Sequence, residues 1–413
     1  MKTCRSCQAI LGEPVLDLGA MPLANSNLKA DRLSASEPAY PLRIFFCGSC
    51  GLVQQLDFTK AEEIFDEYQY FSSYSKSWVE HARLYVDMIT DRLGLDERSS
   101  VIEIASNDGY LLQFFKQKGI PALGIEPSKT VAEAAVAKGL PTLVKFFTSE
   151  LARELAGRGH TADLILGNNV LAHVPNLHDF VEGLSLALKP GGVVTMEFPH
   201  LLRLLEQAQF DTIYHEHFSY FSLTAVERLF ARHGLVLFDV EEIPTHGGSL
   251  RIYGRLASHP DLTITKNVLT IKLQEEKAGL DRRETYVRFA GKVDRVKKGL
   301  VKFLEKARSQ KKRVVGYGAP AKGNTLLNYC GVGTDLLEYT VDASPHKQGL
   351  HLPGSHLPIH APGRIRETKP DFVLILPWNI RDEIMGQMSY IDDWGGKFVV
   401  AIPEVKVLRP SDV

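Results

Sequence analysis

The chain carries almost no net charge. Lys and Arg together number 48, Asp and Glu number 49, and the formal charge at pH 7 is −1. A protein that binds nucleic acid normally shows a basic excess or a basic stripe, and neither is present. The sequence therefore argues against nucleic acid as a partner.

Long apolar runs are also missing. The longest, such as FVLIL (372–376), have the length of a β-strand and fall far short of a membrane-spanning helix. The beginning, MKTCRSCQAI, lacks the apolar segment of a signal peptide. We therefore expect no membrane partner and a cytoplasmic location. The composition, 44% apolar and 23% charged, is that of an ordinary globular protein, and 413 residues predict two or three domains.

Cysteine is scarce and unevenly placed. Four of the five cysteines form two CxxC pairs within the first 50 residues, Cys4-x-x-Cys7 and Cys47-x-x-Cys50. Two such pairs suit one tetrahedral Zn²⁺, whereas free thiols or a redox pair are the alternatives. Because all four positions are cysteine, none is left for a water ligand, and we expect one structural zinc per chain. Cys330, in LLNYCGV, is predicted to be a small buried residue.

Hydrophobic periodicity divides the rest of the chain into two α/β units. Residues 75–95 have a helical pattern, after which short apolar strands alternate with helices, as in a parallel sheet of βαβ units. Its strands are expected at 100–106, 121–127, 162–169 and 192–199, with a further pair at 235–243 and 249–257. A charged helical stretch, 264–312, leads to the second unit. The strands of that unit are expected within 312–327, 337–345, 371–379 and 397–408.

The first unit contains a small-residue turn in VIEIASNDGYLL (101–112). Ala105, Ser106 and Gly109 would let a ligand approach the backbone where the strand ends. The turn lacks the GxGxxG spacing of dinucleotide-binding proteins, and Asp108 suits a ligand that carries an amino group. The next strand ends in GIEP, which places Glu126 where it can accept hydrogen bonds from both ribose hydroxyls.

Two further features fit the same ligand. Phe146 or Phe147 could pack on an adenine ring, and the LKPGG turn (188–192) is common in class I methyltransferases. Singly, each acid could merely cap a loop. Together the features indicate an S-adenosylmethionine site, with NAD as the alternative.

The stretch TIYHEHFSYFS (212–222) places two histidines on either side of Glu216, among aromatic residues. It could be a metal site, a piece of satisfied core, or a group of acid–base residues. Surrounding aromatics lower the local dielectric and shift pKa values, and histidine takes up a proton near pH 7, which favours acid–base chemistry. In NNVLAHVPN, Asn168, Asn169 and His173 follow a strand expected beside the donor, so His173 could reach the methyl-accepting region or simply face solvent.

Carbon methylation would need such a group. A carbon atom has no lone pair, so a base must first remove a proton next to a carbonyl. The enolate oxygen that results needs a hydrogen-bond donor, a role for tyrosine or histidine.

The whole chain resembles the S-adenosylmethionine-dependent C-methyltransferases that build branched deoxysugars from nucleotide-linked 4-keto-hexoses. The resemblance rests on a series of motifs in a fixed order. These are the CxxC pairs with DLGAMPLAN, then YQYFSSYS, EIASNDGYLL, GIEPS, NNVLAHVPN, YHEHFSYFS, HGGSLRIY and GYGAPAKGNTLLNY.

The resemblance implies an α/β protein of three parts joined by a connector. These are a zinc-binding domain (1–68), a Rossmann-like class I methyltransferase domain (69–260), a helical connector (261–311) and a Rossmann-like α/β domain for the nucleotide sugar (312–413). It further implies a substrate that is a nucleoside-diphosphate keto-deoxysugar, methylated at C-3, and a monomer or weak homo-oligomer.

The resemblance also assigns roles to residues. His217 would be the general base, Tyr214 would donate to the enolate oxygen, and Glu216 and His173 would support substrate and base. Tyr68 would reach the sugar, with Tyr70 and His215 as further substrate contacts. The cofactor would be bound by Glu103, Ala105, Asn107, Asp108, Gly109, Glu126, Phe146, Phe147, Asn168 and Asn169.

The second unit begins with VVGYGAPAKGN (314–324), a strand, a glycine turn and a helix start. Its backbone amides, with Lys322 and Asn324, suit a diphosphate. The turn lacks the last glycine of the dinucleotide fingerprint, which argues against a nicotinamide cofactor there. An NAD(P)-dependent oxidoreductase acting on a nucleotide sugar is the alternative function. A non-catalytic zinc adaptor is a third interpretation, which the neutral charge and the YHEH stretch disfavour.

Overall fold

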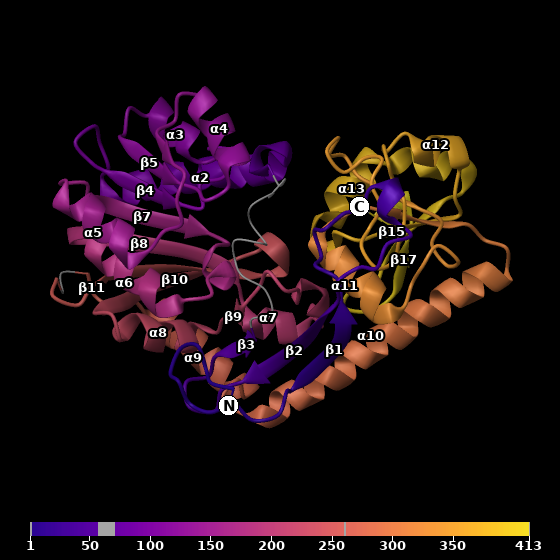
Figure 1. Ribbon diagram of the computed structural model, residues 1–413, viewed down its shortest axis with the longest axis horizontal. Coiled ribbons are helices and arrows are strands. Elements are labelled where there is room, and N and C mark those ends of the chain that lie inside the picture. The colour runs from indigo at the N-terminus through magenta and orange to yellow at the C-terminus, as the bar shows by residue number, and fades with distance from the viewer. Residues whose placement is uncertain (1, 57–70, 260–261, 413) are drawn as a thin grey trace.

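The computed structural model describes residues 2–56, 71–259 and 262–412, which form three β-sheets with their helices. In Figure 1 the N-terminal strands and a long helix, α10, run along the base of the molecule, beneath the central and C-terminal sheets. The protein is a mixed α/β protein, and its mostly parallel central sheet agrees with the predicted βαβ pattern.

The N-terminal sheet is antiparallel and is completed by a strand from the middle of the chain. It consists of β1 (Leu16–Met21), β2 (Tyr40–Phe46), β3 (Val53–Gln55) and β9 (Ser219–Tyr220), in the order β1-β2-β3-β9. In the last pair Val53 lies opposite Tyr220, and Gln54 lies opposite Ser219. Because β9 follows the YHEH segment (214–217) almost immediately, the N-terminal sheet determines where that segment lies.

The central sheet has seven strands in the order β10-β11-β8-β7-β4-β5-β6. All six predicted strands are present; β11 runs antiparallel to both of its neighbours, β8 and β10, and the other strands run parallel to one another. The bounds are β4 (Val101–Ile104), β5 (Ala122–Ile125), β6 (Thr142–Leu143), β7 (Ala162–Asn168), β8 (Leu188–Pro199), β10 (Leu235–Ile243) and β11 (Ser249–Leu256). The carboxyl ends of parallel strands meet at one edge of a sheet, which is where ligands bind in open α/β folds.

Helices cover both faces of this sheet because alternate strand residues point to opposite sides. One face packs on α2 (Lys76–Leu93) and α3 (Leu112–Gln117). The other packs on α5 (Ser149–Gly157), α6 (Leu177–Ala187) and α8 (Leu223–Ala231). Two shorter helices complete this part, α4 (Lys129–Ala137) and α7 (Leu201–Glu206).

The predicted helical connector consists of α9 (Lys266–Ala278) and α10 (Arg283–Ser309). Buried residues recur along α10 at spacings of three and four, which gives this charged helix one apolar face. That face shares one apolar cluster with the N-terminal strands, α7 and the C-terminal sheet. The connector therefore packs against all three sheet-containing parts.

The C-terminal sheet has six strands in the order β14-β13-β12-β15-β16-β17, and only β17 is antiparallel. Its strands are β12 (Val314–Tyr317), β13 (Thr340–Val341), β14 (Ile359–His360), β15 (Phe372–Ile375), β16 (Lys397–Val400) and β17 (Lys406–Leu408). The accompanying helices are α11 (Ala321–Cys330), α12 (Arg364–Thr368) and α13 (Arg381–Gln387).

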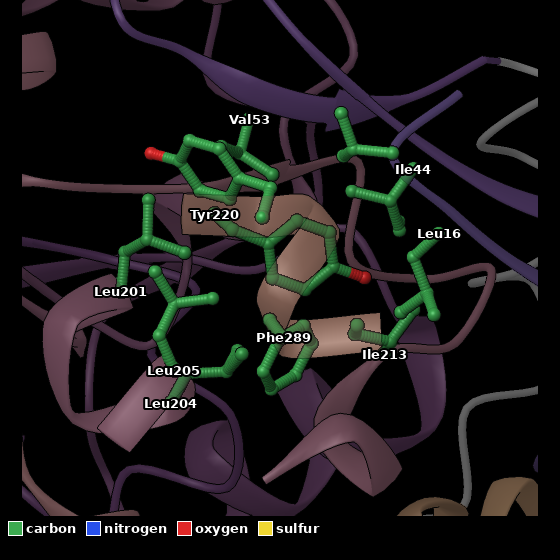
Figure 2. Close-up of a pocket in the computed structure, with 11 residues that line it drawn as sticks. Leu16, Ile44, Val53, Leu201, Leu204, Leu205, Ile213, Tyr220 and Phe289 are labelled. Atoms are coloured by element: carbon green, nitrogen blue, oxygen red, sulfur yellow. The ribbon is translucent and has the colours of Figure 1, made fainter. Parts of the chain in front are cut away.

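A small apolar cavity lies where the N-terminal sheet, α7 and α10 meet (Figure 2). Its volume is about 10 Å³, and Leu16, Ile44, Leu201 and Phe289 are among the side chains around it. A space of this size holds about one water molecule. It is a packing gap in the shared core and offers no binding chemistry. None of the described helices has the length and apolar character that crossing a membrane requires.

Candidate active site and zinc site

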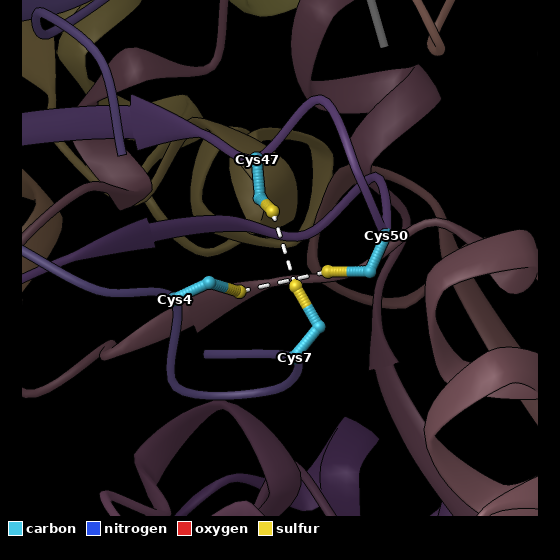
Figure 3. A group of neighbouring side chains, drawn as sticks. All are labelled: Cys4, Cys7, Cys47 and Cys50. Carbon is cyan, nitrogen blue, oxygen red and sulfur yellow. Dashed lines mark hydrogen bonds between the residues drawn. The ribbon is translucent and has the colours of Figure 1, made fainter. Parts of the chain in front are cut away.

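The four N-terminal cysteines converge, as Figure 3 shows. All four Sγ atoms lie within 4.8 Å of one another, and the closest pairs, Cys4–Cys50 and Cys7–Cys47, are 3.5 and 3.4 Å apart. Four sulfurs about 2.3 Å from a tetrahedral Zn²⁺ would be a little under 4 Å apart, so the cluster fits that ion. Backbone and side-chain amides also point at one thiol, because Ser6 N and Gln54 Nε2 donate to Cys4 Sγ. With no ligand position left for water, the site is structural.

The turn that follows β4, residues 105–109, is called the donor turn below because the methyl donor is predicted to bind there. It has an unusual backbone. Ala105 and Asn107 adopt left-handed conformations, with φ of 56° and 51°, which non-glycine residues rarely do outside functional sites. Gly109 is also left-handed. A Cβ there would lie 2.2 Å from Leu140 Cδ1, so core packing by itself requires glycine, and the contact of Gly109 with a ligand stays a prediction.

Glu126 lies at the end of β5, directly beside the donor turn. Its carboxylate accepts hydrogen bonds from the backbone amides of Asn107 (3.0 Å) and Ser128 (2.8 Å). Burial raises its pKa, although the two amides oppose that effect. The bonds hold the acid in place with the remaining lone pairs of its oxygens free to accept from a ligand.

Several buried polar atoms around this turn have no partner among the described residues. They are Glu103 Oε2, Ser106 Oγ, Asp108 Oδ1, Ser128 Oγ, Asn169 Oδ1 and both side-chain polar atoms of Asn168. Buried polar groups are almost always hydrogen-bonded, so such a concentration indicates a polar ligand. The other Asp108 oxygen accepts from Ser73 and from Lys138. Burial, together with Glu126 and Asp108, raises the pKa of Glu103 well above its usual range.

The two phenylalanines predicted near an adenine ring have different surroundings. Phe147 is buried and packs edge-to-face on Phe180, with ring centroids 5.5 Å apart. Its ring is therefore part of the core, contrary to the prediction. Phe146 is 42% exposed and is the one whose ring face a ligand could use.

The YHEH segment is held by the N-terminal domain. Gln55, at the end of β3, donates to the backbone carbonyls of Tyr214 (3.2 Å) and His215 (2.6 Å). From the zinc loop, Arg5 donates to the carbonyls of Gln55 and Pro175. The segment therefore depends on contacts from residues far away in the sequence.

His217 is buried at the centre of the site, with both ring nitrogens hydrogen-bonded. Nδ1 lies 2.8 Å from the carbonyl of Thr212, and Nε2 lies 2.9 Å from the hydroxyl of Tyr214. A carbonyl can only accept, so Nδ1 carries the hydrogen and Nε2 presents its lone pair to the tyrosine. Burial, reinforced by His173, His246 and Lys322, holds the pKa of His217 well below its usual range. This neutral imidazole has the form that a general base needs.

His173 and Glu216 flank this base as predicted. The ring centroids of His173 and His217 are 4.7 Å apart, and burial lowers the pKa of His173 to about 4. Glu216 is buried and accepts a hydrogen bond from Asn25 Nδ2 at 2.6 Å. Burial raises the pKa of Glu216 to about 7, although Asn25 and Lys347 lower it.

His215 points elsewhere. Its Nε2 donates to the carbonyl of Tyr40 (3.1 Å) on β2, and its ring packs edge-on to the Tyr40 ring. The predicted substrate contact is therefore an anchor to the N-terminal sheet. Tyr68 and Tyr70, also predicted to reach the sugar, lie outside the described residues.

His246 is a site residue that the sequence reasoning missed. Asn169 Nδ2 donates to its Nε2 at 2.9 Å, and its ring lies 5.1 Å from that of Trp78. Burial lowers the pKa of His246 to about 4, with Lys322 contributing. In the sequence, the two glycines that follow His246 in HGGSLRIY could have indicated a tight turn at a functional site. In the structure His246 itself is left-handed, with φ of 54°.

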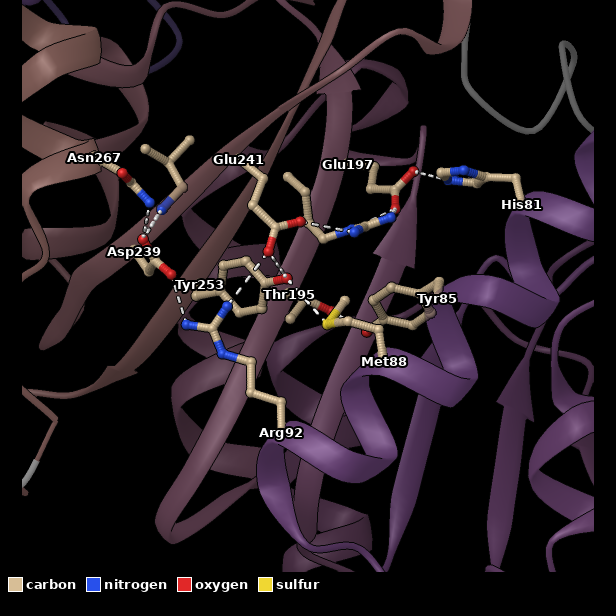
Figure 4. Close-up of polar contacts among 12 residues, drawn as sticks. His81, Tyr85, Met88, Arg92, Thr195, Glu197, Asp239, Glu241, Tyr253 and Asn267 are labelled. Atoms are coloured by element: carbon tan, nitrogen blue, oxygen red, sulfur yellow. Dashed lines mark hydrogen bonds and ion pairs between the residues drawn. The ribbon is translucent and has the colours of Figure 1, made fainter.

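The nearby end of β8 is held by a buried ion-pair network, shown in Figure 4. Glu197 accepts from Arg251 and lies 2.8 Å from His81 Nε2, and Arg251 also pairs with Glu241. Interactions with the buried charge partners lower the pKa of Glu197 despite its burial. The network ties α2 to β8, β10 and β11 below the site.

Two backbone amides of the glycine turn in the C-terminal domain are already paired within the protein. Gly318 N donates to the Val341 carbonyl, and Ala319 N donates to the Asp342 carboxylate at 2.7 Å. Asn324 is buried, and its amide donates to the Ala24 carbonyl of the N-terminal domain. These groups are thus paired within the protein, and Asp342 would repel a phosphate beside them, whereas a diphosphate at the start of α11 with Lys322 stays a prediction.

Comparisons with known proteins agree with this geometry. Residues 4–65 match a family model described as "Putative zinc binding domain", residues 78–240 match a methyltransferase domain, and residues 244–403 match a C-methyltransferase C-terminal domain. The C-methyltransferase NovU of Streptomyces niveus is 35% identical over 405 residues, which cover 98% of this chain and 96% of NovU. The chain belongs to this C-methyltransferase family.

More distant similarities cover only part of this C-methyltransferase. A ubiquinone biosynthesis O-methyltransferase of a Chelativorans species is 28% identical over 26% of the chain and 46% of that relative. The PH0226 protein of Pyrococcus horikoshii matches 48% of the chain and 99% of its own length, with 17% identity and a TM-score of 0.36. The CcbJ methyltransferase of Streptomyces caelestis matches 48% of the chain and 96% of its own, with 13% identity and a TM-score of 0.34.

The protein is therefore an S-adenosylmethionine-dependent C-methyltransferase with a zinc-binding N-terminal domain. The matches give no support to a nicotinamide-dependent oxidoreductase. Among the described residues, the four cysteines are the only group of three or more ligands that converges. The YHEH segment thus forms no metal site with the part of the chain that the structure covers.

Replacing Glu126 by Ala should weaken S-adenosylmethionine binding on the order of tenfold or more, because hydrogen bonds to a charged acceptor contribute roughly 1.5–3 kcal/mol. Calorimetric titration with the donor measures this directly. Glu133→Ala is the matched control, since Glu133 pairs only with Lys129 on the surface of α4. Unchanged donor affinity in Glu126→Ala would contradict this placement of the donor site.

Proposed function

We propose that the enzyme transfers the methyl group of S-adenosylmethionine to a ring carbon of a nucleoside-diphosphate 4-keto-deoxysugar, at C-3, through an enolate. The observation that carries the proposal is the buried, neutral His217, whose Nε2 lone pair faces the hydroxyl of Tyr214. Such a pair of groups suits proton removal next to a ketone.

In the proposed first step the Tyr214 hydroxyl turns from His217 Nε2 to the carbonyl oxygen of the bound sugar, and the freed Nε2 lone pair takes the proton from C-3. The electron pair of the broken C–H bond forms a double bond to C-4, and the carbonyl oxygen becomes the enolate oxygen. Tyr214 donates a hydrogen bond to that oxygen, where the negative charge develops. His173 and His246 are neutral, so they add polar contacts without placing a second cation against the imidazolium as it forms.

In the second step the enolate carbon attacks the methyl group. S-adenosylmethionine supplies an electrophilic methyl on a positively charged sulfur and leaves as a neutral thioether. Glu103, Asn107, Asp108 and Glu126 would hold the donor at the carboxyl ends of β4 and β5. Attack by carbon requires the two ligands to approach closely, which the junction of three domains would enforce by excluding water.

The test uses the keto-sugar without the methyl donor. In D₂O the enzyme should exchange the C-3 proton of the correct substrate for deuterium, which NMR or mass spectrometry detects. A panel of dTDP-, GDP- and CDP-linked 4-keto-deoxysugars identifies the nucleotide. If methylated product forms from a substrate that has no exchangeable proton beside a ketone, the enolate mechanism is wrong.

Glu216 should give the reaction a pH dependence near neutrality. A carboxylate that accepts hydrogen bonds from sugar hydroxyls must be ionised, and its pKa of about 7 means that this form is lost as the pH falls below that value. Turnover at saturating substrate should therefore rise through about pH 7. Glu216→Gln should lower turnover and flatten this limb, whereas Glu227→Gln, on the surface of α8, should keep the wild-type profile. If the turnover of Glu216→Gln still falls as the pH drops below about 7, a group other than Glu216 causes this pH dependence.

A further inference from the structure

Lys322, on the first turn of α11, lies against Trp378 in the C-terminal domain. Its Nζ donates to Asn379 Oδ1 at 2.7 Å and lies 4.9 Å from the centre of the Trp378 ring. Burial lowers the pKa of Lys322, while the nearby carboxylate of Asp211 raises it. A lysine that is kept charged inside a protein needs such compensating partners.

The indole of Trp378 connects this lysine to two segments of the methyltransferase domain. Its Nε1 donates to Asp211 Oδ2 at 2.7 Å, just before the YHEH segment. Gly247, next to His246, lies against the ring so closely that a Cβ would be 2.4 Å from it. The same tryptophan therefore fixes Lys322, the base segment and the His246 loop relative to one another.

Asp211 is the acid that acts on Lys322. It is completely buried, burial raises its pKa to about 6, and its Oδ1 has no partner among the described residues. The charge of Lys322 also acts on both His217 and His246, lowering the pKa of each. Among the described residues, Tyr214, Tyr220 and His173 face His217, and His246 and Lys322 further lower its pKa.

We propose that Lys322 supplies the positive charge that stabilises the enolate formed at His217, and does not bind the diphosphate of the substrate. This inference rests on the proposed enolate chemistry and names a further residue for it. The base step places a negative charge on the sugar oxygen and a positive charge on His217. A fixed cation in a water-poor site lowers the energy of that oxygen anion at no cost of reorganisation. The methyl transfer then consumes the anion, and Lys322 undergoes no covalent change.

Deuterium exchange at the sugar carbon, measured without S-adenosylmethionine, isolates this step. Lys322→Met should lower the exchange rate about 10²-fold, the usual effect of losing one stabilising group at an oxyanion. Lys322→Arg keeps the charge and should restore part of the rate. Lys297→Met is the matched control, because Lys297 likewise lies over an aromatic ring, that of Tyr329, and this variant should exchange like the wild type.

Two further measurements exclude a merely structural role. Lys322 lowers the pKa of His217. In Lys322→Met the fall of the deuterium exchange rate at low pH should therefore begin at a higher pH than in the wild type. In Lys322→Arg it should begin near the wild-type pH. The affinity for free nucleoside diphosphate, measured by calorimetry, should not change in Lys322→Met. If Lys322→Met binds nucleoside diphosphate more weakly but exchanges deuterium at the wild-type rate, the proposal is overturned and Lys322 is a diphosphate ligand.

The outcomes separate this inference from the proposed function. If wild-type enzyme exchanges the proton and His217→Asn does not, the enolate mechanism stands whatever Lys322 does. Exchange at the wild-type rate in Lys322→Met then refutes the role of the lysine alone. If the wild type exchanges nothing with any competent substrate, the enolate mechanism fails, and this role of Lys322 fails with it.

Discussion

His217→Asn should depress turnover by roughly 10²–10⁴, the usual contribution of a positioned proton acceptor. Asparagine can still donate to the Thr212 carbonyl, so the segment should keep its conformation. It offers no lone pair basic enough to take a proton from carbon. Binding of S-adenosylmethionine should survive, because the donor contacts come from the turns after β4 and β5.

The neighbouring histidine provides the matched control. His215 has the same chemistry two residues away, but its ring contacts Tyr40 of the N-terminal sheet. His215→Asn should therefore cost stability more than turnover per folded molecule. Equal losses of turnover in the two variants would mean that packing of the segment, and not proton removal, explains the effect.

The proton exchange gives the decisive measurement. Without the methyl donor, His217→Asn should stop deuterium incorporation into the sugar, while His215→Asn should retain it. A His217→Asn variant that exchanges as fast as the wild type would show that another residue is the base. Because the pKa of His217 is held well below its usual range, its acid limb should lie below pH 6.5 and so be separable from the limb of Glu216.

The strands and the zinc ligands could be predicted from sequence because their signals are local. Alternating apolar runs define β4, β5, β7 and β8, and two CxxC pairs define a metal site wherever the chain folds. The donor turn is also local, since Ala105 and Glu126 follow consecutive strands whose ends must meet. These features depend on spacing alone.

Residue roles that depend on distant contacts were harder to assign. His215 and His217 look equivalent in sequence, and only the pairing of β3 with β9 turns one to the N-terminal sheet and leaves the other in the site. Phe147 was one of two candidates for the adenine ring, and its packing on Phe180 could not be read from the sequence, nor could the packing of Gly109 against Leu140. Lys322 followed a glycine turn, which suggested phosphate, yet the domain packing carries its amine to Trp378 and Asp211.

The zinc site should affect catalysis through the same distant contacts. Cys47→Ser removes one of four thiolates. The loss of metal should unfold the two CxxC turns, called the zinc knuckle, because folding of small zinc domains is coupled to metal binding, which contributes roughly 10–16 kcal/mol. We expect about one Zn²⁺ per wild-type chain by elemental analysis and much less in the variant. Its thermal stability and solubility should fall together.

Turnover should fall as well, although no substrate contact is changed. Cys47 directly follows β2, the strand that pairs with β3. Gln55, at the end of β3, donates hydrogen bonds to the backbone of Tyr214 and His215. In the fraction that stays folded, donor binding should persist, since the turn at Glu126 belongs to the central sheet. Loss of methylation with retained donor affinity is therefore the expected signature.

Cys330→Ser is the matched control for this prediction. Cys330 is buried in α11, outside the cluster, and burial raises the pKa of its thiol to about 12. That variant should lose a modest amount of stability but bind zinc at the wild-type ratio. Carefully purified wild-type protein without zinc would refute the metal site. A Cys47→Ser variant that lacks zinc yet methylates normally would instead show that the knuckle does not position the YHEH segment.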